Sequence, residues 1–158
     1  MEYSIRDAQV GDMEQVLGLI KQLAAFEKEG DAVEVTVADL QRDGFEKRLF
    51  HCFVAEVAGA IVGIALVYPR YSTWKGPVIH LEDLIVAEEM RGKGLGNALL
   101  HKVVSYGKVL GVKRICWEVL DWNEPAIKFY EKQGARVMRD WDVVQMDANG
   151  MAAFLKEV

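Results

Sequence analysis

The chain is poor in the residues that form disulfide scaffolds and metal clusters. It has two cysteines and three histidines among 158 residues. His51, His80 and His101 lack the spacing of metal ligands, so we predict no metal. Cys52 and Cys116 lie in apolar, strand-like stretches, which favours buried, reduced thiols and a cytoplasmic location.

Long apolar runs and an excess of positive charge are also missing. No run reaches the roughly 20 apolar residues of a transmembrane helix, and residues 1–8 resemble a polar strand rather than a signal peptide. The formal net charge of −5 argues against a nucleic-acid surface and is compatible with a cationic substrate. We expect neither a membrane nor a nucleic-acid partner. The chain has the length of one domain, residues 1–158.

The most informative stretch runs from residue 80 to residue 100. Residues 80–86 read as a strand, and the glycine-rich segment RGKGLG at 91–96 opens a helix with apolar residues at three-to-four spacing. Glycines let the backbone approach a ligand closely at positive φ. The unpaired N–H groups and the dipole of a helix N-terminus attract anions. This stretch therefore predicts an anion-binding loop.

The glycine spacing fits two nucleotide motifs badly. A P-loop needs Lys and then Ser or Thr after its last glycine, whereas Asn97 and Ala98 follow Gly96. The dinucleotide fingerprint is G-x-G-x-x-G, whereas Gly92, Gly94 and Gly96 form G-x-G-x-G. The pattern that does fit is R-x-x-G-x-G. For these six residues alone, an ordinary strand-to-helix turn is the alternative.

The remaining periodicity predicts the element order β-α-α-β-β-β-α-β-α-β-β. A mixture of this kind is α/β or α+β, with a mixed central sheet flanked by helices. The predicted strands cover 3–6, 50–57, 61–68, 80–86, 113–120, 135–138 and 141–146, with a loop over 69–77. The predicted helices run from 13 to about 26–29, from 36 to 45, from the glycine-rich turn 91–96 to about 110, from 123 to 133 and from 151 to 158. Their caps are Asp12, Thr36, Gly111 and Gly134.

The loop pattern and the element order together resemble the GNAT superfamily of acetyltransferases. Over nearly the whole chain, the sequence more closely resembles the spermidine/spermine N-acetyltransferase (diamine acetyltransferase) family. That resemblance rests on IRDA (5–8), LIKQLAAFEK (19–28), DGF (43–45), VAEV (54–57), LEDLIV (81–86), RGKGLG (91–96) and WNEPAIKFYEKQGA (122–135). It implies the GNAT fold, acetyl-CoA as co-substrate and a homodimer, whose interface we expect at residues 143–155.

The resemblance also implies a set of acetyl-CoA contacts. A strand bulge would free backbone N–H groups at residues 84–86, and Asn123 would bond the pantetheine amides. The alternatives are plain core packing for the first and a simple helix cap for the second. The implied cofactor residues are Leu84, Ile85, Val86, Arg91, Gly92, Lys93, Gly94, Leu95, Gly96, Asn97, Asn123, Glu124, Pro125, Ala126 and Tyr130.

Two residues would carry the proton transfers. An alkylammonium of pKa ~10.4 must lose a proton before it attacks, and the departing thiolate needs one. By resemblance, Glu82 is the catalytic base, acting through a water, and Tyr130 is the catalytic acid. An ion pair on the sheet and a solvent-facing helix tyrosine are the respective alternatives. Asp83 should face the other side of the pleat, barring a bulge.

The implied acceptor site is acidic and aromatic. Trp74 is a candidate wall for an aliphatic amine through cation–π contact, or else packs the loop or a dimer partner. Ser72 stands where mammalian polyamine enzymes carry an acid, which leaves room for a lysine-like amine such as thialysine. The implied substrate residues are Phe26, Glu27, Trp74, Glu82, Asp83, Cys116, Trp117 and Glu118.

The predicted activity is acetyl transfer from acetyl-CoA to a primary amine of a small polyamine or diamine. No Ser or Cys has a nucleophile-elbow context, which favours direct transfer in a ternary complex. Two alternatives keep the chemistry, with thialysine or a protein amine as acceptor. A non-catalytic CoA-binding module is the third, and the presence of both Glu82 and Tyr130 argues against it.

Overall fold

The computed structural model describes residues 1–156. It contains two compact units, one from Met1 to Glu118 and one from Val119 onward. In the described part of the chain, no helix combines the length and apolar character needed to cross a membrane.

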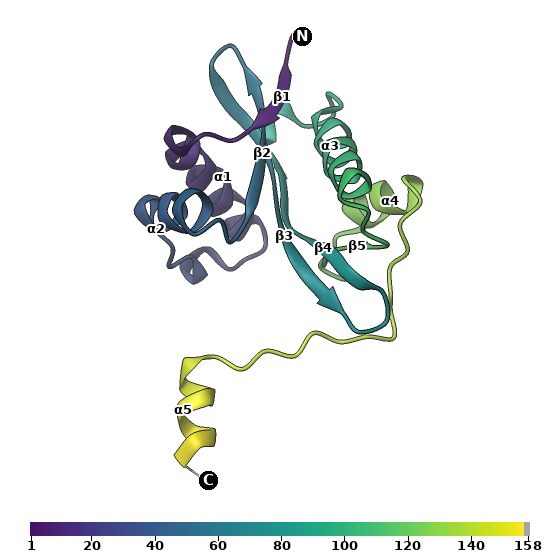
Figure 1. Cartoon of the computed structure of the whole chain (residues 1–158). Coiled ribbons are helices and arrows are strands. Elements are labelled where there is room, and N and C mark those ends of the chain that lie inside the picture. The colour runs from purple at the N-terminus through teal and green to yellow at the C-terminus, as the bar shows by residue number, and fades with distance from the viewer. Residues whose placement is uncertain (157–158) are drawn as a thin grey trace. The chain divides into compact units, whose positions relative to one another are not determined.

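The first unit is built on one five-stranded sheet. Its strands are β1 (Ser4–Asp7), β2 (His51–Val57), β3 (Ala60–Ser72), β4 (Gly76–Val86) and β5 (Ile115–Cys116), adjacent in this order. The first four pair antiparallel, and β5 pairs parallel to β4 (Figure 1). Together with the flanking helices, this mixed sheet confirms the predicted fold class.

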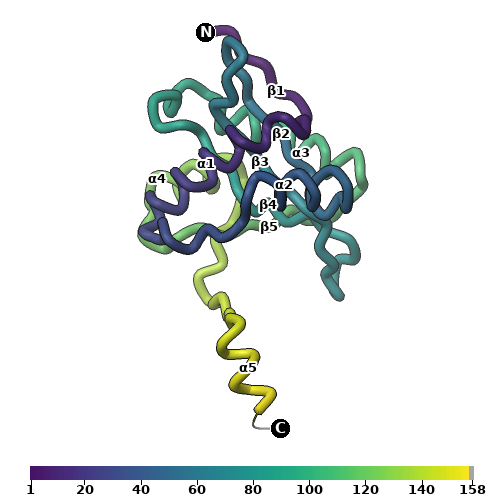
Figure 2. The backbone as a smooth tube through the Cα atoms, turned by 90° about the vertical axis from the view of Figure 1, so that its left-hand side faces the viewer, coloured from purple at the N-terminus to yellow at the C-terminus, as the bar shows by residue number. Residues whose placement is uncertain are grey.

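Helices cover both faces of that sheet. On one face, α1 (Met13–Phe26) lies beside α2 (Val37–Gln41), which continues as the π-helical turn η3 (Arg42–Glu46) (Figure 2). On the other face lies α3 (Leu95–Leu110) (Figure 1). Short 3-10 turns η1 (Val10–Asp12), η2 (Gly30–Ala32) and η4 (Glu88–Met90) connect them. The main core cluster includes Met13, Val16, Leu17, Leu40, Cys52, Val54, Ile64, Leu66 and Ile85.

The helix ends follow the predicted caps at all but one position. The Thr36 hydroxyl accepts from the Asp39 N–H at 3.1 Å, and the Asp39 carboxylate accepts from the Thr36 N–H at 2.9 Å. Gly111 ends α3 at φ 75°. Asp12 differs, because its side chain does not cap α1 but accepts hydrogen bonds from the Gln9 N–H and the Arg6 guanidinium.

The second hairpin is longer than predicted. In the segment predicted as a loop, residues 69–72 and 76–77 continue the two strands and only 73–75 form the turn, with Arg70 opposite Val78 and Ser72 opposite Gly76. The hairpin contains Pro69 and Pro77, which have no backbone N–H to donate. A strand tolerates proline where the ladder requires no donor at that position. Strand β5 is shorter than the predicted 113–120, because only Ile115 and Cys116 pair with β4.

The second unit contains α4 (Glu124–Lys132) and α5 (Ala148–Lys156). The Asn123 side chain accepts from the Ala126 N–H at 3.4 Å, and Gly134 follows the helix at φ 93°, as the predicted caps require. Helix α5 agrees with the predicted C-terminal helix up to Lys156, and residues 157–158 lie outside the described residues.

The two strands predicted at 135–138 and 141–146 do not form within the described chain. A strand is stable only when its N–H and C=O groups pair with a neighbour, and no ladder includes these residues. Their apolar side chains are exposed, with Trp141 65% and Val144 91% accessible. Alternating apolar residues here mark a segment with strand propensity that lacks a pairing partner.

Candidate active site

The glycine loop forms an open cradle at the start of α3. Gly92 and Gly94 adopt φ values of 75° and 85°, which favour glycine, and no atom lies within 4 Å of the position of a Cβ at either residue. Gly94 is the N-cap of a 16-residue helix. The N–H groups of Leu95, Gly96 and Asn97 have no carbonyl four residues earlier within that helix. Such groups are suited to an anion, and the predicted role in holding the diphosphate of CoA stays a prediction.

The two cations of the loop differ in their surroundings. The Arg91 Nε donates to the Val86 carbonyl at 3.3 Å, and the Arg91 guanidinium carbon lies 5.5 Å from the Phe26 ring centroid. Arg91 thus connects the loop to the end of β4 and the end of α1. The exposed Lys93 ammonium lies 3.6 Å from the Met90 sulfur, which is a weak acceptor. Lys93 is therefore the better placed charge for a phosphate.

The outer edge of β4 is open within the first unit. Residues 84–86 pair with residues 63–65 of β3 on one side. On the other side, β5 pairs with β4 only at Ile79 and His80, and no strand of residues 1–118 continues that ladder. Backbone N–H groups of residues 84–86 on this edge are placed to donate to a bound carbonyl, and their predicted contact with acetyl-CoA stays a prediction.

A β-bulge at Glu82 shapes the acidic side of the strand. Leu66 pairs with Asp83 and Val67 pairs with Leu81, so Glu82 is an extra residue without a partner. Cross-strand partners lie on the same face of a sheet. Leu66 and Tyr68 also share a face, because they are two residues apart on β3. Asp83 therefore lies on the same face as His80, which pairs with Tyr68. The expectation that Asp83 points away from Glu82 excepted a bulge, and this bulge shifts the alternation by one residue, so the exception applies.

Glu82 is held by two neighbours on that face. Its Oε2 accepts from the Tyr68 hydroxyl at 2.9 Å and lies 3.4 Å from His80 Nε2. Burial raises the pKa of Tyr68 to about 12, and the hydrogen bond to Glu82 acts in the same direction. The charge of Glu118 also raises the pKa of Tyr68, and Arg70 opposes it. Tyr68 is thus a stable neutral donor beside a carboxylate.

Burial and mutual repulsion perturb the neighbouring acids. Burial, followed by the charges of Glu82 and Glu27, raises the pKa of Asp83 to about 6. Burial and then Glu29 raise the pKa of Glu27, which follows the last residue of α1. Carboxylates that repel one another in this way are stabilised by an added cation.

Three polar residues of this cluster were not predicted from the sequence. Tyr68, Arg70 and His80 lie together with Cys116, which the resemblance does imply as a site residue. The predicted strand ends at Tyr68, so Arg70 falls in the predicted loop. The spacing of Tyr68 and Arg70, two residues apart, would have placed both on one face of a longer strand.

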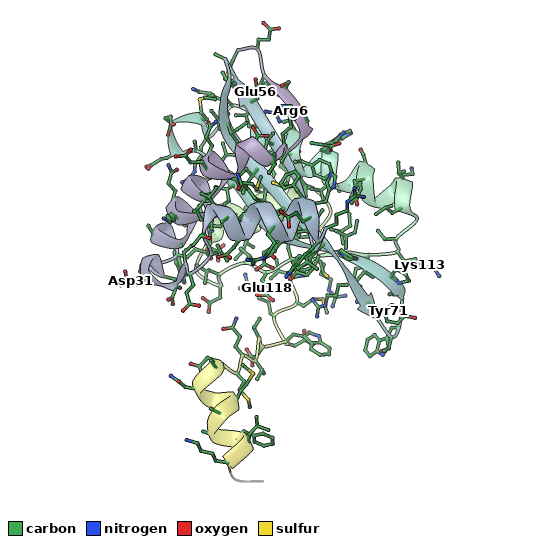
Figure 3. The ribbon with its side chains drawn as sticks, turned by 60° about the vertical axis from the view of Figure 1, so that its left-hand side comes forward. Arg6, Asp31, Glu56, Tyr71, Lys113 and Glu118 are labelled. Atoms are coloured by element: carbon green, nitrogen blue, oxygen red, sulfur yellow. The ribbon has the colours of Figure 1, made fainter. Side chains whose placement is uncertain are left out.

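Trp74 lies at the tip of the β3–β4 hairpin. The backbone N–H groups of Trp74 and Lys75 donate to the Ser72 hydroxyl at 3.2 and 3.1 Å, respectively. The Trp74 side chain is 80% exposed, so it does not pack the loop. Figure 3 shows Tyr71 of the same hairpin apart from Glu118. A contact with an acceptor or a dimer partner stays a prediction for Trp74.

The predicted site residues of the second unit occupy the start and middle of α4. Asn123 caps the helix, Glu124, Pro125 and Ala126 form its first turn, and Tyr130 is half-buried on it. The Tyr130 ring lies 5.4 Å from that of Phe129. The functional roles of these residues stay predictions.

A cavity of about 560 Å³ lies elsewhere in the first unit and contains none of the predicted site residues. Its lining is mostly apolar and includes Phe45, Phe50, Tyr106 and Leu110. Of Tyr68, His80, Glu82 and Asp83, only Tyr68 lines this cavity. Within residues 1–156, no group of three His, Cys, Asp or Glu side chains could hold a metal ion.

Comparisons with known proteins relate this chain to a family and a fold. Residues 18–135 match the model of the acetyltransferase (GNAT) family. The thialysine N-epsilon-acetyltransferase of Bos taurus is 37% identical, covering 93% of this chain and 94% of its own length. The spermidine/spermine N(1)-acetyltransferase-like protein 1 of Homo sapiens is 38% identical over 84% of this chain and 20% of its own length. An aminoglycoside N-acetyltransferase solved in complex with CoA superposes with a TM-score of 0.72 at 20% identity, covering 91% of this chain and 94% of that one.

The chain belongs to the acetyltransferase (GNAT) family. It is an acetyl-CoA-dependent N-acetyltransferase, and the predicted resemblance to the spermidine/spermine acetyltransferases is confirmed.

Proposed function

We propose that this enzyme acetylates a primary amine of a small cationic molecule, with a diamine or polyamine as the first candidate acceptor. The observation that carries the proposal is the bulge at Glu82, which brings the Glu82 and Asp83 carboxylates to one face of the sheet beside Tyr68. Glu27 and Glu118 act electrostatically on Asp83 and Tyr68, respectively. An ammonium group entering this cluster would relieve their repulsion.

Thialysine or a similar lysine-like amino acid is the second candidate acceptor. Two observations favour it. The bovine relative bears this substrate in its name. Ser72, which stands at a position where an acid would favour long polyamines, instead accepts hydrogen bonds at the hairpin tip. One fewer charge there favours a shorter acceptor.

The chain's own residues would divide the work as follows. The backbone of residues 92–97, with Lys93, holds the diphosphate, and the open edge of β4 orients the acetyl thioester that the co-substrate supplies. Glu82 takes a proton from the ammonium through a water, and Asp83 keeps the amine close. The amine nitrogen then bonds to the acyl carbon as the carbon–sulfur bond breaks, and the nitrogen releases its second surplus proton to water. Tyr130 gives its proton to the departing thiolate.

We also propose a cytoplasmic homodimer of a single-domain chain, without nucleic-acid or membrane partners and without a metal. The apolar side chains of the segment 143–155 support the dimer, because Val143, Val144, Phe154 and Leu155 are all more than half exposed. Sedimentation of the full chain with and without Val144→Asp tests this assembly.

The decisive experiment measures thiol release from acetyl-CoA with a panel of amines. The panel contains a diamine, spermidine, thialysine and a lysine peptide, and calorimetry measures CoA binding in parallel. Turnover with the small amines and little with the peptide supports the proposal. Tight CoA binding without turnover on any amine would instead establish a non-catalytic CoA-binding module.

A further inference from the structure

A thiol, an imidazole and a carboxylate form a chain of contacts across β5 and β4. Cys116 pairs with His80 in the parallel ladder, and the Cys116 Sγ lies 3.6 Å from His80 Nδ1. The other ring nitrogen, His80 Nε2, lies 3.4 Å from Glu82 Oε2. An imidazole bonded to a carboxylate on one nitrogen and facing a thiol on the other is suited to take the thiol proton.

The contacts around His80 assign its tautomer. Its Nδ1 faces two donors, the Cys116 thiol and Arg70 Nη1 at 3.4 Å. Its Nε2 faces an acceptor, the Glu82 carboxylate. The proton therefore belongs on Nε2, and the lone pair of Nδ1 points at the thiol.

The Arg70 guanidinium completes the site. Its Nη1 lies 3.9 Å from the Cys116 Sγ, close enough to stabilise a thiolate as it forms. His80 is only 6% exposed, so its ring is held in place, whereas Cys116 is half-buried and accessible to a small reagent. Two carboxylates, Glu82 and Glu118, act on the His80 and Tyr68 side of this site against the single positive charge of Arg70. We therefore expect a net negative potential on the approach to this thiol.

We propose that Cys116 is a reactive thiol, activated by His80, that forms mixed disulfides with small cationic aminothiols. In the balanced step, the Sγ proton passes to His80 Nδ1 and the thiolate attacks one sulfur of an aminothiol disulfide. A new disulfide forms at Cys116 while the reagent's own disulfide breaks. The leaving aminothiolate takes the proton from His80. Cys116 is thereby oxidised, and half of the reagent is reduced to a free thiol.

The second cysteine provides an internal control. Cys52 is 5% exposed in the core, and burial raises the pKa of its thiol to about 12. Its thiol donates to the Phe53 carbonyl at 3.6 Å, whereas the Cys116 Sγ lies 3.6 Å from the Ile79 carbonyl oxygen and also 3.6 Å from His80 Nδ1. Cys52 should remain unmodified as long as the fold is intact, so its protection reports on folding in every variant.

The test uses the full chain, cystamine as the cationic disulfide and 5,5′-dithiobis(2-nitrobenzoate) as the dianionic one. Mass spectrometry of the intact chain and of its peptides follows the modification. We expect one aminothiol on Cys116, reversed by dithiothreitol and absent in Cys116→Ser but present in Cys52→Ser. His80→Gln should slow the reaction at least tenfold, the order of a lost general base, while Cys52 stays protected.

Charge selectivity is measured against a small cysteine amide as a free-thiol reference. Relative to this thiol, Cys116 should prefer cystamine over the dianion by about tenfold at low ionic strength. An unchanged rate in His80→Gln, or a relative preference for the dianion, would overturn the inference. Because no acetyl-CoA is present in this assay, its outcome is independent of whether the proposed acetyl acceptor is correct.

Discussion

The Tyr68 hydroxyl donates a 2.9 Å hydrogen bond to the carboxylate of Glu82, the extra residue of the bulge in β4. The bond joins a residue of β3 to the proposed catalytic base. It keeps one Glu82 oxygen oriented while the carboxylate remains about half exposed, so the other oxygen can meet a water or a substrate.

Replacing Tyr68 with Phe should therefore impair catalysis more than stability. A hydrogen bond to a charged group contributes about 1.5–3 kcal/mol. If that stabilisation is lost from the transition state, kcat/KM for the amine falls roughly 10- to 100-fold. Steady-state kinetics with thialysine or a diamine checks this. The matched control is Tyr71→Phe, since Tyr71 is 72% exposed on the same strand. Equal kinetics of the two variants would remove Tyr68 from the site.

Asp83 should make the fold less stable as the pH rises. Its pKa in the folded chain is raised from 3.8 to about 6, so the folded state binds the proton more tightly than the unfolded chain. The associated stabilisation is complete below pH 4 and is lost as the pH rises through 6. Asp83→Asn should raise the free energy of unfolding by about 1–3 kcal/mol at pH 7.5 and change it little at pH 3.5. Urea unfolding at both pH values measures this, and a gain that is equal at both would contradict it. The same variant should bind the amine more weakly.

Gly94→Ala should weaken acetyl-CoA binding. A Cβ meets no atom there, but φ of 85° strains any L residue by about 1 kcal/mol or more, so the loop would shift away from its cradle geometry. We expect the KM for acetyl-CoA to rise several-fold while the KM for the amine stays constant. Gly18→Ala is the control, because Gly18 lies in α1 with open space and an ordinary φ. That change should stabilise the helix by about 0.5–1 kcal/mol without affecting kinetics.

Asp12 contributes to stability through Arg6, not through capping. Its carboxylate accepts from Arg6 at 2.8 and 3.1 Å and from the Gln9 N–H at 2.7 Å, and Arg6 also bonds Glu56 (Figure 3). The Arg6 guanidinium lowers the pKa of Asp12, so this stabilisation is present at neutral pH and is lost as the pH falls below about 4. Asp12→Asn should lower the unfolding free energy by about 2–3 kcal/mol at pH 7. The exposed Glu14→Gln in the same helix should change it by less than about 0.5 kcal/mol.

Tyr130→Phe tests the proposed acid. The ring is half-buried on α4, and removing only its hydroxyl preserves the packing against Phe129. We expect normal thermal unfolding and a fall in kcat of about 100-fold, the usual scale of a lost general acid. Rates near those of the unchanged enzyme would withdraw the assignment.

The local features of the chain are largely readable from its residues. Thr36, Gly94, Gly111 and Asn123 act at helix ends as their types predict, because caps and positive φ values depend on a few neighbouring atoms. The loop RGKGLG and the segment WNEPAIKFYEKQGA also indicate the family by their residue types and spacing alone.

The predictions fail where strand pairing decides the outcome. Strand β3 continues through Ser72 because β4 offers it a partner, whereas residues 135–146 remain unpaired despite their strand-like pattern. Propensity describes how well a residue fits a pleated surface, but the presence of a neighbouring strand is a property of the fold.

The sequence by itself therefore determined the family, the glycine loop at the start of α3 and the class of reaction, since these depend on residue types at fixed local spacings. Only the tertiary structure decided that Glu82 and Asp83 share a face, and that His80 stands between a carboxylate and the Cys116 thiol. One unpaired residue in β4 reverses the alternation of every side chain after it, and the register between strands, not the local sequence, determines where that residue lies.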